Sequence, residues 1–314
     1  MAHLGLITGT RVMTIEGEVA VEKLRSGAQA LTLASTERPI QPLTSVAIGP
    51  VPEGAWPILV RAGAVAEGMP IRDLLLAPDQ ALVMREDADD AIKLDFSKRR
   101  LIPARVLANA ATVTRVRPPG GSRYYRPIVA SPDLLMANGI CVGVAGPGAS
   151  PALPLMEGEA AQPYHARLLV RARDAGWADT EEPRLAVEFE GEPIPPRHHA
   201  GPALSVDLPE AVQAVVLASR ATVPDELDRS ATDTRRLGVA VAELRLDGTP
   251  IPLDSPLLGA GWYPPERDGS GVWRWTDGTA ALALPPRTGT ARLDIRIHWG
   301  WGRYRVSPEA SPPP

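Results

Sequence analysis

The chain has 314 residues and a formal net charge of −4 at neutral pH. This length predicts two domains that can each bury a core, and the charge gives no electrostatic basis for binding nucleic acid or an anionic membrane surface. The single cysteine, Cys141, excludes an intrachain disulfide framework, and no apolar run is long enough for a membrane-spanning helix.

Short apolar runs interrupted by 34 prolines and 28 glycines favour an all-β chain over a helical one. We expect a first β domain over residues 1–145 and a Pro/Gly-rich linker over 146–164. A β-sandwich of jelly-roll-like type is predicted over 165–306, followed by a disordered tail over 307–314. The first four residues lack the charged and apolar regions of a secretory signal. We therefore expect a cytoplasmic location, with non-classical secretion as the alternative.

The first predicted elements lie within residues 5–33. Apolar and β-branched residues recur in three short bursts, at 10–14, 19–21 and 31–33, and turn-forming sequences centred on Gly17 and Gly27 separate them. Residues 22–25 have room for only one helical turn. This pattern predicts a compact β-meander.

Further strands are predicted downstream, between turns rich in proline and glycine. One of them, within residues 101–109, leads into one helical turn. A run of mixed charges over residues 85–100 is interpreted as a solvated loop or hairpin insertion. The other predicted strands cover residues 43–48, 58–64, 112–116 and 124–129.

Several short motifs in this half occur in the order and spacing of a known family. They are Gly9-Thr10, Val21-Glu22-Lys23-Leu24, Arg61-Ala62-Gly63-Ala64, Arg72-Asp73-Leu74 and Ala137-Asn138-Gly139. Together they resemble the Hint (hedgehog/intein) domain, a self-processing module, in the form found in its bacterial branch. The resemblance covers residues 4 to 143 and implies a β-rich Hint fold.

The same resemblance implies that the residues of the self-processing reaction have been replaced. The family's nucleophilic cysteine corresponds to Gly5, a hydroxyl residue to Ala77 and a histidine to Gln80. Two further family histidines correspond to Arg126 and Pro132. Glutamine can donate a hydrogen bond but cannot transfer a proton near neutral pH, as imidazole can.

We therefore expect a degenerate Hint domain without catalytic residues, acting as a non-catalytic scaffold or interaction module. Apart from His3, this half of the chain has no histidine. The alternative is a residual autoprotease that uses the hydroxyl of Thr8 or Thr10 together with Asp79. The vestigial positions of the site are then Gly5, Thr8, Thr10, Ala77, Asp79, Gln80 and Asn138.

Alternation in the second half predicts about eight short strands, the spacing of a β-sandwich. Turns such as Asp247-Gly248 and Asp277-Gly278 separate them. The predicted strands cover residues 166–173, 184–190, 203–208, 212–219, 238–246, 271–276, 280–284 and 291–299.

Tryptophans are concentrated near the C-terminus, where two pairs are spaced two residues apart. Residues at this spacing on a strand face the same way, so such rings could form a flat platform for stacking sugar rings. The other interpretation is that they fill the core of the sandwich. We favour packing in the core, because this domain has few other aromatic residues, and keep the glycan site as the alternative. The residues of the alternative glycan site are Trp262, Trp273, Trp275, Trp299 and Trp301.

No cofactor or metal site is expected. His198 and His199 are the only adjacent histidines, and neighbours on a strand point to opposite faces. The partner implied by these predictions is an unidentified protein or a glycan, with no nucleic acid and no membrane span.

Overall fold

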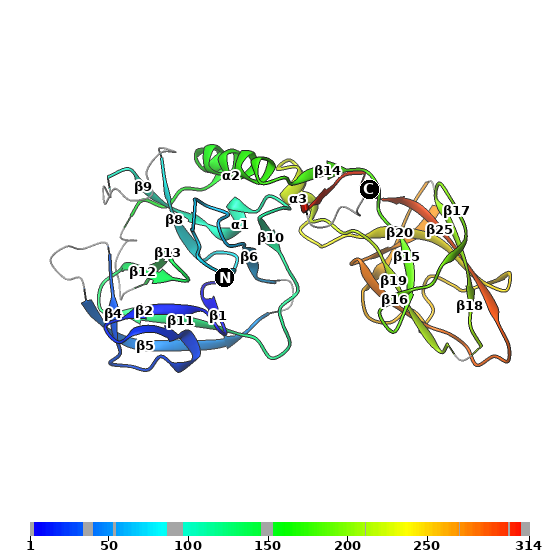
Figure 1. The fold of residues 1–314 in the computed structure, drawn as a ribbon, viewed down its shortest axis with the longest axis horizontal. Helices are drawn as coiled ribbons and strands as arrows, with labels where there is room; N and C mark the ends of the chain where they lie inside the picture. The colour runs from blue at the N-terminus through cyan, green and yellow to red at the C-terminus, as the bar shows by residue number, and fades with distance from the viewer. Residues whose placement is uncertain are drawn as a thin grey trace. The chain divides into compact units, whose positions relative to one another are not determined.

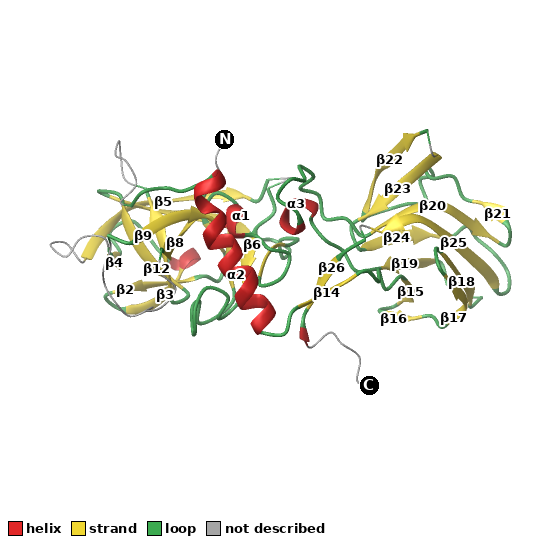
Figure 2. Ribbon diagram, turned by 90° about the horizontal axis from the view of Figure 1, so that it is seen from above, coloured by secondary structure: helices red, strands yellow, loops and turns green. Residues whose placement is uncertain are grey.

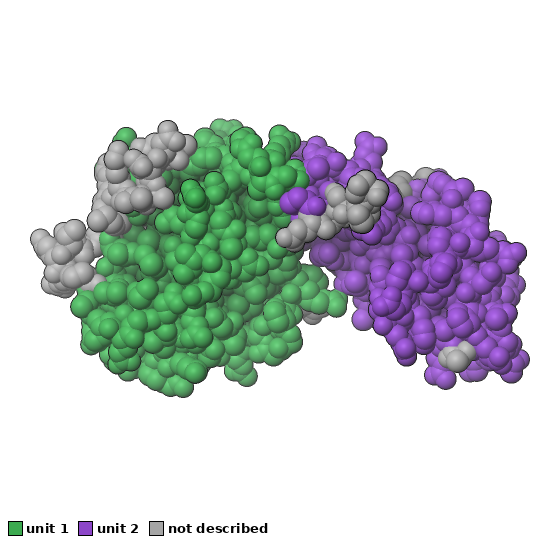
Figure 3. Space-filling view, in the orientation of Figure 1, with its two compact units in different colours: residues 1–177 green, residues 178–314 purple. Residues whose placement is uncertain are grey.

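The structure is a computed structural model, and it divides into two compact units, Met1–Trp177 and Ala178–Pro314 (Figure 3). No helix in the part of the chain described is long and apolar enough to cross a membrane. The description covers residues 3–33, 40–52, 55–86, 97–145, 153–210, 212–269, 271–300 and 302–308, without the side chains of residues 299 and 300.

In its described residues, the first unit consists mainly of short antiparallel strands, with two α-helices and two 3₁₀ turns (Figure 1). Its strands are β1 Leu6–Ile7, β2 Arg11–Thr14, β3 Gly17–Ala20, β4 Gln29–Leu31, β5 Ile40–Pro50, β6 Ile58–Val60, β7 Leu74–Leu76, β8 Ala81–Arg85, β9 Arg99–Pro103, β10 Val113–Arg115, β11 Arg123–Val129, β12 Asp133–Ala137 and β13 Ile140–Val144. Its helical elements are η1 Val21–Lys23, α1 Ala104–Leu107, η2 Gly158–Ala161 and α2 Gln162–Asp174.

The described strands of this unit join in one sheet, in the order β10-β6-β7-β1-β11-β5-β4-β2-β12-β13-β8-β9, with β3 paired to β2. The predicted opening meander is confirmed by β2, β3, η1 and β4, and the predicted strand with its helical turn by β9 and α1. Chain topology brings the short strand β1 between β7 and β11. This placement fixes the surroundings of Gly5, the residue that precedes β1.

Helix α2 corrects the prediction of a strand over residues 166–173. Its buried residues are Tyr164, Leu168 and Ala172, which recur every four residues and so lie on one helical face. Tyr164 and Leu168 pack into the main core of the first unit. Because Pro163 can begin a helix at its first turn, the helix starts inside the segment expected to be a linker. The division into units therefore falls after Trp177, and not within residues 146–164.

The second unit is almost entirely β (Figure 2). Its elements are β14 Ala178–Thr180, β15 Ala186–Phe189, β16 Glu192–Pro193, β17 Pro196–Ala200, β18 Ala203–Leu208, β19 Ala214–Ala218, α3 Pro224–Leu227, β20 Val239–Leu246, β21 Thr249–Pro250, β22 Trp262–Asp268, β23 Gly271–Thr276, β24 Thr279–Ala283, β25 Ala291–Gly300 and β26 Tyr304–Val306.

Two of its sheets enclose a common apolar core, which makes this unit a β-sandwich as predicted. One sheet has the order β17-β18-β25-β20-β23-β22 with β21 on β20, and the other has the order β16-β15-β19-β24. Alternate residues of each face the core, such as Leu204 and Val206 of β18 and Val215 and Leu217 of β19.

Two strands at the edges of the larger sheet were not predicted. β22 contains Pro264 and Pro265, and β17 begins with Pro196 and is exposed along its length. Proline cannot donate to a sheet ladder, so it is tolerated at edges and conceals the strand pattern in the sequence.

Candidate functional site

Gly5, which the sequence resemblance aligns with the Hint nucleophile, lies buried immediately before β1. Its φ is +140°, in a region that residues with a side chain rarely adopt. A Cβ placed there would lie 3.1 Å from the Cβ of Tyr124 and 3.1 Å from the carbonyl oxygen of Tyr125. The backbone therefore accepts glycine at this position and crowds any residue that carries a nucleophilic side chain.

Gln80 stands beside this glycine and joins it to β13. The Gly5 N–H donates to Gln80 Oε1 at 3.2 Å, and Gln80 Nε2 donates to the carbonyl oxygen of Gly143 at 2.7 Å. The Gln80 side chain is only 5% exposed. A neutral amide, which is donor and acceptor at once, is suited to bridging a backbone donor and a backbone acceptor in a buried place.

Ala77 completes this contact from the other side. Its N–H donates to the carbonyl oxygen of Gly5 at 2.9 Å, and its side chain is fully buried. The structure thus brings together the three positions Gly5, Ala77 and Gln80 that the sequence resemblance groups. Their described contacts are structural hydrogen bonds and apolar packing.

Asp79 belongs to a chain of ionic contacts at the edge of this group. Its Oδ2 accepts the backbone N–H of His3 at 2.7 Å, and its Oδ1 accepts Nε of Arg105 at 2.7 Å. Arg105 also pairs with Glu157 at 2.6 Å. Burial alone would raise the pKa of Asp79, but the hydrogen bonds from Arg105 and His3 outweigh it and lower the pKa below its usual value. The carboxyl is therefore ionised near neutral pH and has no proton to give.

The two candidate hydroxyls bond elsewhere. Thr10 is 3% exposed, and its hydroxyl donates to the carbonyl oxygen of Ile7 at 2.7 Å. The Thr8 hydroxyl accepts the N–H of Arg123 at 3.2 Å. Among the described contacts, neither hydroxyl is bonded to Asp79, so the pairing that an autoprotease would need is not formed.

Asn138 is a turn residue between β12 and β13. Asn138 and Gly139 have φ values of +46° and +82°, as a two-residue hairpin turn requires. The Asn138 side chain accepts the N–H of Arg11 at 2.8 Å and donates to the carbonyl oxygen of Asp73 at 2.8 Å. Residues 137–139 therefore form the hairpin turn and anchor it to neighbouring segments.

The remaining candidate groups of the first unit do not meet at this place. Arg126 is exposed on β11, and Pro132 lies in the turn before β12. Burial raises the pKa of the Cys141 thiol to about 11, although nearby Arg99 lowers it in part. The thiol is therefore protonated near neutral pH and a poor nucleophile.

The burial of Trp273 and Trp275 agrees with the favoured interpretation of core packing and contradicts the alternative, a glycan platform, for this central pair. Trp273 and Trp275 are 6% and 4% exposed and share a cluster with Leu237 and Ala240. Trp262 is partly buried, and its indole N–H donates to the carbonyl oxygen of Ala281 at 2.8 Å. The two central rings pack inside the unit because large aromatic rings fill space between small side chains. The side chain of Trp299 and the whole of Trp301 lie outside the described residues.

Among the described residues, no group of three or more histidine, cysteine or acidic side chains is arranged to hold a metal ion. His198 and His199 lie on the exposed edge strand β17.

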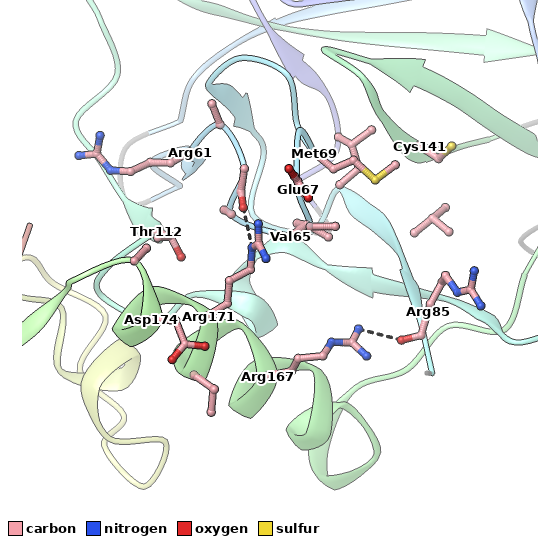
Figure 4. Close-up of a pocket in the computed structure, with 18 of the residues that line it drawn as sticks. Arg61, Val65, Glu67, Met69, Arg85, Thr112, Cys141, Arg167, Arg171 and Asp174 are labelled. Atoms are coloured by element: carbon pink, nitrogen blue, oxygen red, sulfur yellow. Dashed lines mark hydrogen bonds between the residues drawn. The ribbon is translucent and has the colours of Figure 1, made fainter. Parts of the chain in front are cut away.

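A cleft that the sequence did not predict lies in the first unit, where α2 faces the turn after β6 (Figure 4). Its volume is about 1040 Å³. Arg171 Nε donates to the carbonyl oxygen of Gly63, and Arg167 Nη2 donates to that of Arg85, each at 2.8 Å. The sequence does contain one indication of this cleft, the four-residue spacing of Arg167 and Arg171, which places both on one face of a helix. A strand over the same residues would not bring these two side chains together in this way.

Residues 4–148 match the family model described as "Hint domain". No curated protein and no solved structure matches the chain. The first unit therefore contains a Hint domain, as the sequence motifs predict. The match ends before the second unit begins.

Proposed function

We propose that the Hint domain of this chain retains the fold without the self-cleaving reaction and serves as a non-catalytic scaffold or interaction module. The observation that supports this most strongly is the Gln80 bridge between Gly5 and Gly143. Where a self-cleaving domain needs a nucleophile and a proton donor, this chain has a glycine without a side chain and a neutral amide.

The contacts around this bridge also support a non-catalytic role. Asp79 is ionised and paired with Arg105, and the hydroxyls of Thr8 and Thr10 have backbone partners. The thiol of Cys141 is buried and protonated near neutral pH. None of these groups combines an activated nucleophile with a base.

A carrier protein fused upstream of Met1 tests the proposal. The fusion is incubated overnight with and without dithiothreitol and hydroxylamine, which release the upstream segment from a thioester or ester, and its intact mass is measured. A self-cleaving Hint domain with the same carrier shows that the reagents work. We expect the mass of this fusion to stay unchanged.

Release of the carrier would contradict the proposal and favour the autoprotease. The variants Thr8→Ala and Thr10→Ala would then identify which hydroxyl acts, because only loss of the reacting oxygen stops the cleavage.

A further inference from the structure

The cleft between α2 and the turn after β6 carries an excess of positive charge. Five arginines line it, against the two carboxylates of Glu67 and Asp174. The full chain has a net charge of −4, so this concentration of arginine is a local feature. A concave surface lined by one sign of charge attracts the opposite charge more strongly than a flat surface does.

The central guanidinium is fixed by the backbone. Arg171 Nε donates to the carbonyl oxygen of Gly63, which is a neutral group. The carboxylate of Asp174, one turn further along α2, lines the same cleft. Gly63 is in turn held by its own N–H, which donates to the carbonyl oxygen of Pro70 at 2.9 Å. A guanidinium oriented in advance loses less entropy when it binds a carboxylate or phosphate.

A second arginine, Arg61, lines the cleft from the segment after β6. It lies over the ring of Trp177, with its guanidinium carbon 5.5 Å from the ring centre, and its side chain extends away from Arg171 (Figure 4). In the described part of the chain, neither Arg61 nor Arg171 forms an ion pair with a carboxylate. Arg171 is therefore the arginine best placed to meet an anion in the middle of the cleft.

The rest of the wall is apolar. Val170, next to Arg171 on α2, is 56% exposed, and Val65, Met69 and Trp177 line the same space. Pockets for small organic molecules combine mostly apolar walls with a few fixed polar groups and have volumes of about 300–1000 Å³. This cleft has that composition and reaches the upper end of that size range.

We propose that this cleft binds an organic anion, a molecule with a carboxylate or phosphate group on an apolar body. The anionic group contacts Arg171, and the apolar body lies against Val170 and Val65. The lining does not include Gly5, Ala77 or Gln80, so this inference goes beyond the proposed loss of self-cleavage and does not depend on it.

Isothermal titration calorimetry of the full chain with three probes of equal tail length tests the proposal. Undecanoate supplies a carboxylate, decyl phosphate supplies a phosphate, and decyl maltoside is the uncharged comparison, each kept below the concentration at which it forms micelles. We expect binding of at least one anion to be about tenfold tighter than that of the maltoside. We also expect this binding to weaken as ionic strength rises. The stronger of the two anions identifies the natural group.

Variants on α2 provide a matched comparison. Arg171→Gln removes a charge from the cleft, whereas Arg173→Gln removes one from an exposed position of the same helix outside the lining. We expect the first to weaken anion binding about tenfold and the second to change it less than twofold. Val170→Asp, at an exposed position that folding does not require, should weaken it as well by repulsion.

Two results would overturn the proposal. One is that neither anion binds more tightly than the maltoside. The other is that Arg173→Gln weakens binding as much as Arg171→Gln and Val170→Asp do, since the attraction would then be a general effect of charge. Thermal unfolding of each variant confirms that the protein compared is folded.

Discussion

A single backbone conformation makes Gly5 incompatible with a nucleophile. At φ +140°, with Tyr124 and Tyr125 at 3.1 Å from an added Cβ, any side chain meets both backbone strain and crowding. Strain of this kind costs about 1–3 kcal/mol. Under the proposed function, a single substitution at this position is therefore not expected to create a self-cleaving site, because the packing around Gly5 would have to change as well.

We predict that Gly5→Cys destabilises the fold by at least about 2 kcal/mol and produces no cleavage. Gly5→Ala should cost nearly as much, because the Cβ is the source of the crowding. Gly9→Ala is the matched control, since Gly9 has φ +89° but no atom within 4 Å of its added Cβ. Urea unfolding measures all three. A Gly5→Ala protein as stable as the wild type would contradict this explanation.

The ion pair of Asp79 predicts a dependence of stability on pH. Its folded-state pKa is lowered, so its contribution is present above the unfolded pKa of about 3.9 and is lost as pH falls through the folded value. Asp79→Asn should therefore be less stable than the wild type at pH 7. Because the pair is partly exposed, the difference should be below about 1 kcal/mol.

That difference should shrink as the pH is lowered from about 4, where unfolded aspartate begins to bind protons. Denaturant titrations of the wild type and Asp79→Asn at pH 7 and pH 3 measure this difference in stability. A double-mutant cycle is completed by two further variants, Arg105→Gln and the combination of Arg105→Gln with Asp79→Asn. A stability difference that grows toward pH 3 would show that the sign of the pKa shift is wrong.

Among the secondary-structure elements, α2 differs most from the sequence prediction, because a helix replaces the predicted strand and lines the cleft. The sequence around Leu168 and Val170 contains short apolar and charged alternations that fit a strand as well as a helix. Burial distinguishes the two, since Leu168 is fully buried and Val170 is 56% exposed. In a strand the two residues would share a face.

Alanine substitutions on α2 test this assignment. Leu168→Ala should destabilise the first unit by about 2–5 kcal/mol, because it leaves a cavity in the core. Val170→Ala should change stability by less than about 0.5 kcal/mol, as expected for an exposed site. Chemical unfolding followed by circular dichroism measures both. Equal losses for the two variants would instead favour the strand.

For the chain as a whole, the predictable part was local. Strands with clear alternation and turns with glycine, such as Gly17 and Gly27, were found because their signals lie within a few residues. Gly5, Ala77 and Gln80, which the resemblance groups, are neighbours in the structure. The hydrogen bonds that join them were not predictable, because β1 reaches Gln80 and Gly143 only after the sheet has formed.

The arginine-lined cleft lay further beyond sequence reasoning. It combines Arg61 and the turn after β6 with Arg171, more than a hundred positions later, and this meeting depends on α2 being a helix that packs on the Hint domain. Likewise, the tryptophan spacing identified a shared face correctly, but spacing alone does not distinguish a buried face from an open one.

The exchange rate of the Gly5 amide proton, followed by NMR in the wild type and in Gln80→Ala, tests most directly whether the group of Gly5, Ala77 and Gln80 is a closed structural contact. The amide is buried and bonded to Gln80 Oε1. We therefore predict strong protection in the wild type and a large loss in the variant, with neighbouring β11 amides unaffected. A Gly5 amide that exchanges as fast as an unfolded peptide in the wild type would mean that the centre is open, and would contradict the structural role assigned to Gln80.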